Sequence, residues 1–418
     1  MPARRVASGP RRRARGGPPR SRPINRAVLH GRRRGGVDGY LRAMYAEELL
    51  APWLAVLRDQ LPPLDLVDMH VHVGLADPAG LLATEEEALG SLGLADAHGV
   101  VFPLRDPGGY RGPNNRVLEL AHSSDGRVTA LARLDPADDP LHEAVRCLDA
   151  GAAGIKLHPR GEGFALDDRR LDDVFALADE RRLPVMIHAG QGVPEMVDHV
   201  HRRSREHPQA RLVLAHCAAG MFDGVWPRID DYPNVLFDTS WWNPATIAAL
   251  LRLVPPSRIL FGSDIPFATP TQQAVQTLRL ALQVGLTDGQ IQGIMGGQAR
   301  CVLARQDLLD LGPTPAPEQQ AMAPALERMY VMLAAVCERM LGGHDGGQEL
   351  QLARDGCAAG ADGPDGGVLR AVGGLLEQIE GRPDRDPLRQ LRTPGFDLAL
   401  VAATVARTPD APVPALGR

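Results

Sequence analysis

The sequence predicts an α/β protein folded as a (β/α)8 TIM barrel, in which eight parallel strands alternate with helices. Eight short apolar runs recur at intervals of about 23–33 residues, and each is followed by a turn and a helical pattern. Five of these runs end in side chains that can bind a metal ion, and the carboxyl ends of barrel strands meet at one face. No GxGxxG loop follows the first run, which disfavours a doubly wound open sheet.

The chain before the first strand divides into two parts. Residues 1–36 contain 12 Arg and no acidic residue, are rich in Pro and Gly, and lack the apolar core of a signal peptide. We expect them to form a disordered basic arm. Residues 38–59 follow with an amphipathic helical pattern, which we expect Pro52 to kink or split.

Residues 37–312 hold the predicted barrel, and its strands are expected where the apolar runs lie. The runs are Leu66–Val73, Gly99–Leu104, Val128–Leu134, Gly154–His158, Pro184–His188, Arg211–His216, Val235–Thr239 and Arg258–Asp264. Their near-continuous apolar character indicates strands that are buried on both faces, as in parallel sheets.

Residues 313–418 form a predicted helical extension after a Pro-rich linker. Apolar residues recur there at helical spacing, at Leu326, Met329, Leu333, Val336 and Met340. Gly/Asp-rich stretches at 343–347 and 356–367 separate this segment from further helical patterns at 368–380 and 396–407. We expect the extension to pack on the barrel or on a partner subunit in a homo-oligomer, and it offers no chemistry of its own.

Charge and composition narrow the class of partner. Outside the basic arm, 34 basic residues face 51 acidic ones, a net charge of −17, which argues against nucleic acid as the main ligand. No apolar run of 18 residues occurs, so we expect no membrane contact. Five Cys without CxxC spacing fit a reduced, cytoplasmic protein. A scaffold or RNA-associated protein that uses the basic arm remains a rival hypothesis.

The candidate site consists of polar residues at five strand ends. His70 and His72 alternate on the first strand and so point to one side, into the barrel mouth. The fourth strand ends with Lys156 and His158, the fifth with His188, the sixth with His216 and the eighth with Asp264. Several imidazoles and one carboxylate in a buried pocket suit a divalent transition metal. Lys156 is the only lysine of the chain, and a buried amine can lose its proton, unlike a guanidinium.

This order of residues resembles the amidohydrolase superfamily, over about residues 65–305. The segments Gly154–Pro159 and Phe261–Pro266 look most like its amidohydrolase-related branch, which contains metal-dependent hydrolases and non-oxidative decarboxylases. The resemblance implies one metal held by His70, His72 and Asp264. It also implies a second metal held by His188, His216 and a carboxylated Lys156. Asp264 would then accept the proton of the attacking water and deliver it to the leaving group.

The resemblance also allows a one-metal assignment. In decarboxylase-like members a single zinc is bound by the residues equivalent to His70, His72, His188 and Asp264. His216 is then an acid/base without metal, and Lys156 is a cation that could hold a substrate carboxylate. The sequence leaves one or two metals, with Zn²⁺ expected, and the carboxylation of Lys156 open.

Several residues near the strand ends are candidates for binding a small-molecule substrate. Trp241 and Trp242 follow the seventh strand and could form an apolar wall, or could pack the loop onto the barrel. Arg105 and Arg160 are candidates for binding a carboxylate, and His158 lies near the rim of the mouth. Asp238 is expected to orient a ligand histidine.

Taken together, these features predict a metal-dependent hydrolase. We expect it to cleave an amide, lactone or ester bond of a small cyclic or aromatic molecule by a metal-activated water. The alternative is a zinc-dependent non-oxidative decarboxylase of an aromatic or enoic acid. Nucleic acid is not an expected partner, because only the basic arm could contact it.

Overall fold

The computed structural model describes residues 47–192, 196–315, 322–379, 393 and 395–415. The basic arm and the first part of the helix predicted over 38–59 lie outside these residues. The described remainder of that helix, α2 (Glu47–Arg58), runs through Pro52 without being split. Its apolar stripe, including Trp53 and Leu57, is buried.

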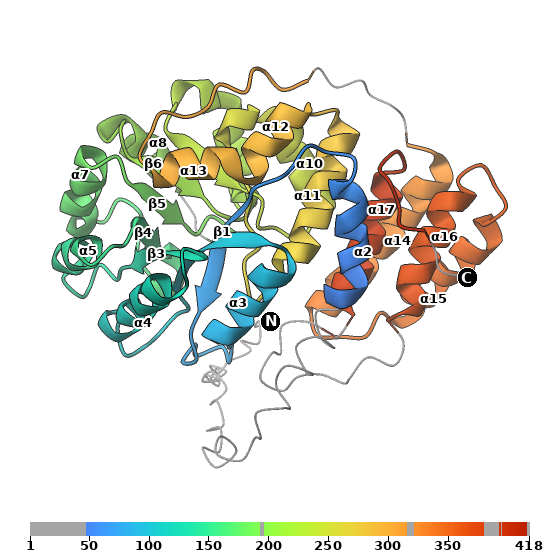
Figure 1. Cartoon of the computed structure of the whole chain (residues 1–418), viewed down its shortest axis with the longest axis horizontal. Helices are drawn as coiled ribbons and strands as arrows, with labels where there is room; N and C mark the ends of the chain where they lie inside the picture. The colour runs from blue at the N-terminus through green and yellow to red at the C-terminus, as the bar shows by residue number, and fades with distance from the viewer. Residues whose placement is uncertain (1–46, 193–195, 316–321, 380–392, 394, 416–418) are drawn as a thin grey trace, which may run out of the picture.

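Eight parallel strands form the barrel and confirm the predicted fold class. Their order in the sheet follows the chain from first to last (Figure 1). The strands are β1 (Leu66–Val73), β2 (Ala97–Pro103), β3 (Val128–Arg133), β4 (Gly154–Leu157), β5 (Pro184–Ile187), β6 (Arg211–Leu214), β7 (Val235–Asp238) and β8 (Ile259–Leu260).

The last strand is much shorter than the predicted run Arg258–Asp264, yet the chain beyond it closes the barrel. The Met69 amide donates to Phe261 O at 2.9 Å, and the Asp264 amide donates to His70 O at 2.8 Å. The segment after β8 therefore remains hydrogen-bonded to β1, and it carries Asp264 to the two histidines.

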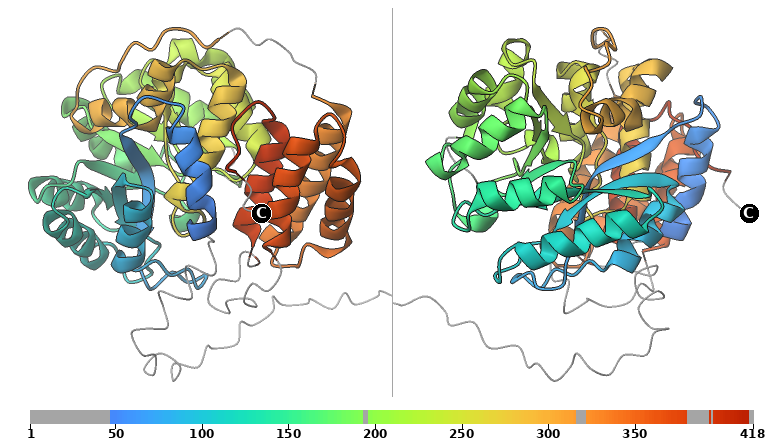
Figure 2. Two further views of the ribbon diagram at one scale, coloured as in Figure 1. Left: turned by 45° about the vertical axis from the view of Figure 1, so that its right-hand side comes forward. Right: turned by 60° about the vertical axis from the view of Figure 1, so that its left-hand side comes forward.

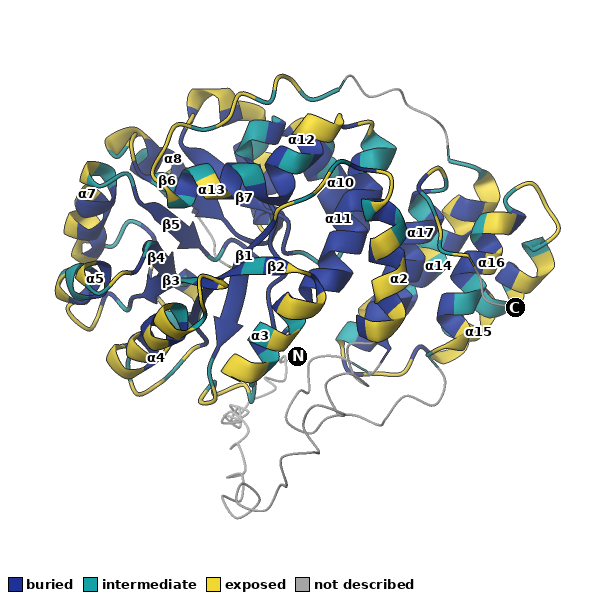
Figure 3. Ribbon diagram, in the orientation of Figure 1, coloured by how far each residue is buried: buried dark blue, intermediate teal, exposed yellow. Residues whose placement is uncertain are grey.

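Helices cover the outside of the barrel, and their exposed faces turn outward (Figure 3). They are α3 (Glu85–Leu94), α4 (Arg111–Ser123), α5 (Pro140–Asp149), α6 (Pro159–Glu162), α7 (Asp172–Glu180), α8 (Met196–Glu206), α9 (Phe222–Val225), α10 (Pro244–Leu253), α11 (Pro270–Val284), α12 (Asp288–Gln292) and α13 (Gln298–Leu303). Helix α11 differs from the others, because every residue from Pro270 to Ala281 is buried.

An apolar layer fills the barrel interior below the mouth. Side chains of seven strands contribute to it, among them Met69, Phe102 and Met186. In β4, Ile155 and Leu157 belong instead to the larger core outside the barrel. Because strand side chains alternate, Lys156 between them faces inward, and its Nζ lies 4.5 Å from the centre of the Phe102 ring. The one lysine thus rests directly on the apolar layer.

The C-terminal extension is a group of helices beside the barrel. Helices α2 and α11 lie between this group and the barrel strands (Figures 1 and 2). Its helices are α14 (Pro324–Leu341), α15 (Gly347–Gly360), α16 (Gly366–Glu377) and α17 (Phe396–Arg407). The predicted stripe of α14 is buried. Helix α15 corrects the prediction that 356–367 is only a separator. Its buried residues Ala353 and Cys357 show that packing stabilises a Gly-containing helix there.

Within the part of the chain that is described, no helix combines the length and the apolar character needed to cross a membrane.

Candidate metal centre

Three predicted ligands meet at the mouth of the barrel. His70 Nε2 and His72 Nε2 lie 3.2 Å apart. Asp264 Oδ1 is 3.2 Å from the first and 3.3 Å from the second. All three residues are buried. We call His70, His72 and Asp264 the metal triad.

Hydrogen bonds fix which ring nitrogens face the triad. His70 Nδ1 lies 2.7 Å from Asp238 Oδ2, and a carboxylate accepts, so Nδ1 carries the proton. His72 Nδ1 lies 3.4 Å from the carbonyl oxygen of Pro103, which also only accepts. Both Nε2 atoms therefore present lone pairs, and burial lowers the pKa of both rings well below its ordinary value, which keeps them neutral.

The triad fits a divalent cation. Asp264 Oδ1 is buried and has no hydrogen-bond partner among the described residues. It faces the Nε2 atoms of both histidines, so three possible ligand atoms converge on one point. Burial also raises the pKa of Asp264 well above its usual value, and a bound cation would oppose this effect. Two imidazoles and a carboxylate with an open side are a donor set that Zn²⁺ takes in catalytic sites.

A buried carboxylate ties β1 to the segment that carries Asp264. Asp68 accepts hydrogen bonds from the amide of His70 at 3.0 Å and from the amide of Ser263 at 2.9 Å. It also accepts from Ser263 Oγ at 2.5 Å. Asp264 itself has a φ of 69°, a left-handed conformation that costs energy for a residue with a side chain. The contacts of Asp68 hold the neighbouring backbone in place.

Asp238 at the end of β7 organises the other side of the centre. Besides His70, it accepts through Oδ1 from the His216 amide at 2.8 Å and from Ser240 Oγ at 2.5 Å. This agrees with its expected orienting contact to a ligand histidine. Gly262 allows the close approach, because a Cβ there would lie 3.1 Å from His70 Cβ.

The other predicted ligands form a second group rather than joining the triad. His188 Nδ1 and His216 Nε2 lie 2.9 Å apart, and His216 Nδ1 lies 2.9 Å from the carbonyl oxygen of Ser240. His216 Nδ1 must donate to that carbonyl, so its Nε2 accepts from His188. His188 Nε2 is then a buried lone pair without a partner among the described residues. His158 stacks on His188, with ring centres 3.9 Å apart.

Lys156 lies against the metal triad. Its Nζ is 3.4 Å from His70 Nε2, and the side chain is fully buried. Burial and the charge of Arg133 lower the pKa of this amine to about 7. Lys156 is not among the residues that line the cavity.

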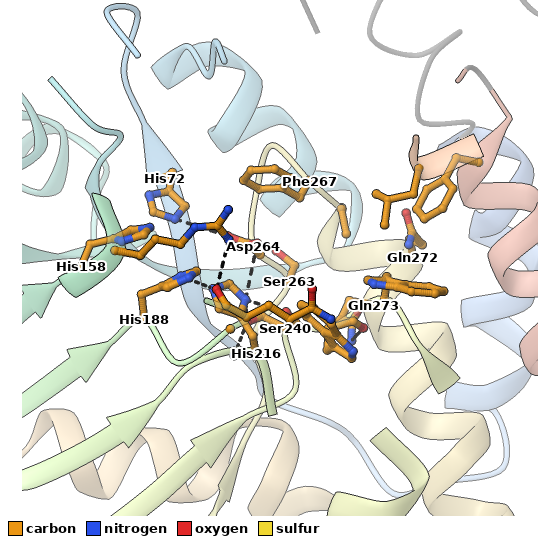
Figure 4. A pocket seen from close by; sticks show the side chains of 18 residues that line it. His72, His158, His188, His216, Ser240, Ser263, Asp264, Phe267, Gln272 and Gln273 are labelled. Atoms are coloured by element: carbon orange, nitrogen blue, oxygen red, sulfur yellow. Dashed lines mark hydrogen bonds and ion pairs between the residues drawn. The ribbon is translucent and has the colours of Figure 1, made fainter. Parts of the chain in front are cut away.

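A cavity of about 290 Å³ opens above these groups (Figure 4). It is lined by His72, His158, Arg160, His188, Gly190, Gln191, His216, Ser240, Trp241, Trp242, Ser263, Asp264, Phe267, Ala268, Gln272, Gln273, Leu341 and Phe396. Trp241, Trp242 and Arg160, which were predicted to bind substrate, thus line the cavity. Arg105 does not line the cavity, and it is exposed.

Sequence reasoning missed several residues of the site. Arg133 at the end of β3 is fully buried and pairs with Glu162 at 2.7 Å, and an arginine inside an apolar run was its signal. Asp68 precedes the His-x-His pattern, and its signal was likewise a charged residue inside an apolar run. Leu341 and Phe396 gave no signal, since nothing local indicates that residues so far along the chain reach the barrel mouth.

The fold and the triad define a metal-dependent enzyme class, and a family comparison agrees. The chain matches the family model described as amidohydrolase over residues 67–305, more than half of its length. The chain therefore belongs to the amidohydrolase family, whose members depend on metal ions.

Solved structures that are similar to this chain cover somewhat more than half of it. A 2,6-dihydroxybenzoate decarboxylase from Rhizobium is 17% identical with a TM-score of 0.47, covering 58% of this chain and 99% of its own. A probable 2-pyrone-4,6-dicarboxylic acid hydrolase from Acinetobacter baumannii is 13% identical with a TM-score of 0.45, covering 58% and 100%. A 4-oxalomesaconate hydratase from Rhodopseudomonas palustris is 19% identical with a TM-score of 0.44, covering 57% and 96%. No curated protein matches the chain in sequence.

Proposed function

We propose that this protein is a metal-dependent hydrolase that cleaves an amide, lactone or ester bond of a small cyclic or aromatic substrate. The observation that supports the proposal is the metal triad, in which two imidazole nitrogens and a carboxyl oxygen converge within 3.3 Å of one another. His70, His72 and Asp264 would hold the ion. A divalent metal supplies Lewis-acid polarisation of a carbonyl and lowers the pKa of water to about 7.

The surrounding residues can move the proton that hydrolysis requires. Asp264 Oδ2 is 3.6 Å from His216 Nδ1, while Oδ1 belongs to the triad. In this proposal Asp264 takes a proton from the attacking water and gives it to the leaving group. His188 Nε2 is a second acceptor in the lining. The Nδ1–H group of His188 donates to His216 Nε2, and His216 Nδ1 donates to the carbonyl oxygen of Ser240.

The charge of the cavity favours a substrate without a carboxylate. Of the cations that could anchor one, Lys156 and Arg105 do not line the cavity. Arg160 does, and its Nη1 donates to the carbonyl oxygen of Gln191 at 3.1 Å. The rings of Trp241 and Trp242 supply a planar, mainly apolar wall. A neutral planar ester, lactone or amide suits this lining.

One observation favours decarboxylation as a second candidate. Within the described residues, the only group of three or more His, Cys, Asp or Glu side chains placed to share an ion is the metal triad. His216 is engaged by Ser240 and His188, as expected of an acid/base without metal. A carboxylate substrate would in that case be held by the metal itself.

Metal content and product analysis test the two candidates together. Purified protein is loaded with Zn²⁺ and its metal content is measured. It is then assayed against a panel of aryl esters, lactones and anilides, and against hydroxybenzoic acids with detection of carbon dioxide. Zinc-dependent release of alcohol or amine supports hydrolysis, and zinc-dependent release of carbon dioxide supports the second candidate. Turnover that is unchanged after chelation and in His72→Ala would contradict both.

A further inference from the structure

The lining of the cavity above the metal triad has two chemically different parts. One part consists of the histidines and Asp264. The lining also includes Leu341, the last residue of α14, and Phe396, the first residue of α17. Both belong to the C-terminal extension, whereas the family match ends at residue 305. Part of the cavity wall therefore comes from a segment that the family barrel does not include.

The extension is held against the barrel by specific contacts of α11. Arg279 is fully buried, and its guanidinium donates to Thr408 Oγ1 at 2.9 Å and to Thr408 O at 2.9 Å. It also donates to the carbonyl oxygens of Ala411 and Pro412. A buried guanidinium without these acceptors would be costly, so the docking is specific. The same helix carries Gln272 and Gln273 into the cavity lining (Figure 4).

The side-chain oxygen of Gln272, in this lining, needs a hydrogen-bond donor. Gln276 Nε2 donates to the carbonyl oxygen of Trp242 at 3.2 Å, which leaves Gln276 Oε1 as an acceptor. Gln272 Nε2 donates to that oxygen at 3.3 Å. The amide of Gln272 is thereby oriented, and its Oε1 is buried with no partner among the described residues. Gln272 is only 1% exposed, so bulk water does not satisfy it.

We propose that the C-terminal extension forms the distal wall of the substrate pocket and selects elongated substrates. The reacting carbonyl lies at the metal triad, and an aryl or alkyl group beyond it packs against Leu341 and Phe396. An N–H or O–H group of the substrate donates to Gln272 Oε1. This inference rests on the proposed function in one respect, namely that the triad binds a metal ion that takes a carbonyl or carboxylate oxygen.

Binding of simple carboxylates to the zinc-loaded full chain tests the wall. Benzoate reaches only the metal end, whereas biphenyl-4-carboxylate adds a second ring, and calorimetry gives Kd for each. We expect biphenyl-4-carboxylate to bind at least about tenfold more tightly than benzoate in the wild type, as burial of an added apolar group predicts. Phe396→Ala should remove most of this difference and leave the Kd of benzoate unchanged.

Two further variants separate the wall from the stability of the extension. Leu341→Trp fills the distal end without creating a hole, and should also weaken only biphenyl-4-carboxylate. Leu375→Ala removes a buried side chain of α16 that does not line the cavity, and should change neither Kd. If Phe396→Ala and Leu341→Trp keep the wild-type preference, or if the wild type has none, the distal wall is not where we place it. If benzoate binding is unaffected by zinc and by His72→Ala, the proposed function fails, and the inference fails with it.

The acceptor is tested with biphenyl-4-carboxylates that carry a hydroxyl at the 3′ or 4′ position. At least one should bind about five- to tenfold more tightly than the parent compound in the wild type, as one hydrogen bond to a buried acceptor predicts. Gln272→Met, which keeps the length and removes the oxygen, should abolish this gain and leave the affinity for benzoate unchanged. No gain from either hydroxyl, or a gain that survives in Gln272→Met, would rule out Gln272 as a donor-seeking group.

Discussion

Asp238→Asn is the substitution that most directly tests how the triad is oriented. Asp238 Oδ1 accepts from the amide of His216 at 2.8 Å, the amide of Ser240 at 3.0 Å and Ser240 Oγ at 2.5 Å. An asparagine must keep an oxygen at this position, because three donors face it. Its NH₂ group then lies where Oδ2 was, 2.7 Å from the protonated Nδ1 of His70.

Two donors facing each other are repulsive, and the imidazole can relieve the conflict by moving its proton. His70 would then carry the proton on Nε2, the atom that faces Asp264 Oδ1 at 3.2 Å, and could no longer ligate a metal. Loss of a partner that orients a ligand histidine typically lowers metal affinity about 10–100-fold. We expect the loss for Asp238→Asn at the upper end of that range, because the tautomer itself is changed.

Competition for Zn²⁺ against a chelating dye measures this affinity, and circular dichroism confirms that the variant is folded. Asp231→Asn is the matched control, since Asp231 is exposed, pairs with Arg228 and does not line the cavity. A folded Asp238→Asn protein that binds Zn²⁺ as tightly as the wild type would show that the orientation argument is wrong.

Three other substitutions test the site and the fold. His72→Ala should abolish metal binding and turnover with little change in Tm, because the large apolar core and not the triad provides most of the stability; retained turnover would contradict the assignment. Lys156→Met replaces the buried amine by a neutral chain of similar length, so a one-metal enzyme should keep its zinc stoichiometry, whereas a centre that needs a carbamate on Lys156 should lose a metal ion. Burial raises the pKa of Glu143, but hydrogen bonds from Arg146 and Asn114 outweigh it and lower the pKa from 4.5 to about 2. Its stabilisation is therefore complete above pH 4.5 and lost as the pH falls towards 2. Urea unfolding measures the free energy of unfolding at pH 7 and at pH 3. Between these pH values it should fall by about 1–2 kcal/mol less in Glu143→Gln than in the wild type, allowing for solvent screening. An identical pH dependence would argue against this hydrogen-bond network.

Local patterns were enough to predict the barrel and to place the three residues of the metal triad at strand ends. Strand residues alternate, and apolar runs of four to eight residues with regular spacing leave few alternatives to parallel strands. The positions of His70, His72 and Asp264 at strand ends then imply proximity, because every strand of such a barrel ends at the same face. No knowledge of distant contacts was needed for these inferences.

The grouping of the remaining side chains required the tertiary structure. His188 and His216 end neighbouring strands, as predicted, but the Ser240 carbonyl binds His216 and turns the pair toward each other. Arg105 follows β2, whereas Arg133 is the last residue of β3, and Arg105 is exposed while Arg133 is buried. The apolar run around Arg133 indicates its burial, but no local pattern indicates the direction of the loop that carries Arg105.

What the sequence by itself determined is the order of the elements and the fold class, which follow from periodicity. It also placed His70, His72 and Asp264 at strand ends, and the family resemblance grouped them as ligands of one metal. Only the tertiary structure decided that Leu341 and Phe396 reach the cavity, through a buried Arg279 that binds Thr408 far along the chain. The physical reason is that contacts between distant segments depend on shape and on the pairing of buried polar groups. Neither shape nor polar pairing produces a periodic pattern in the sequence.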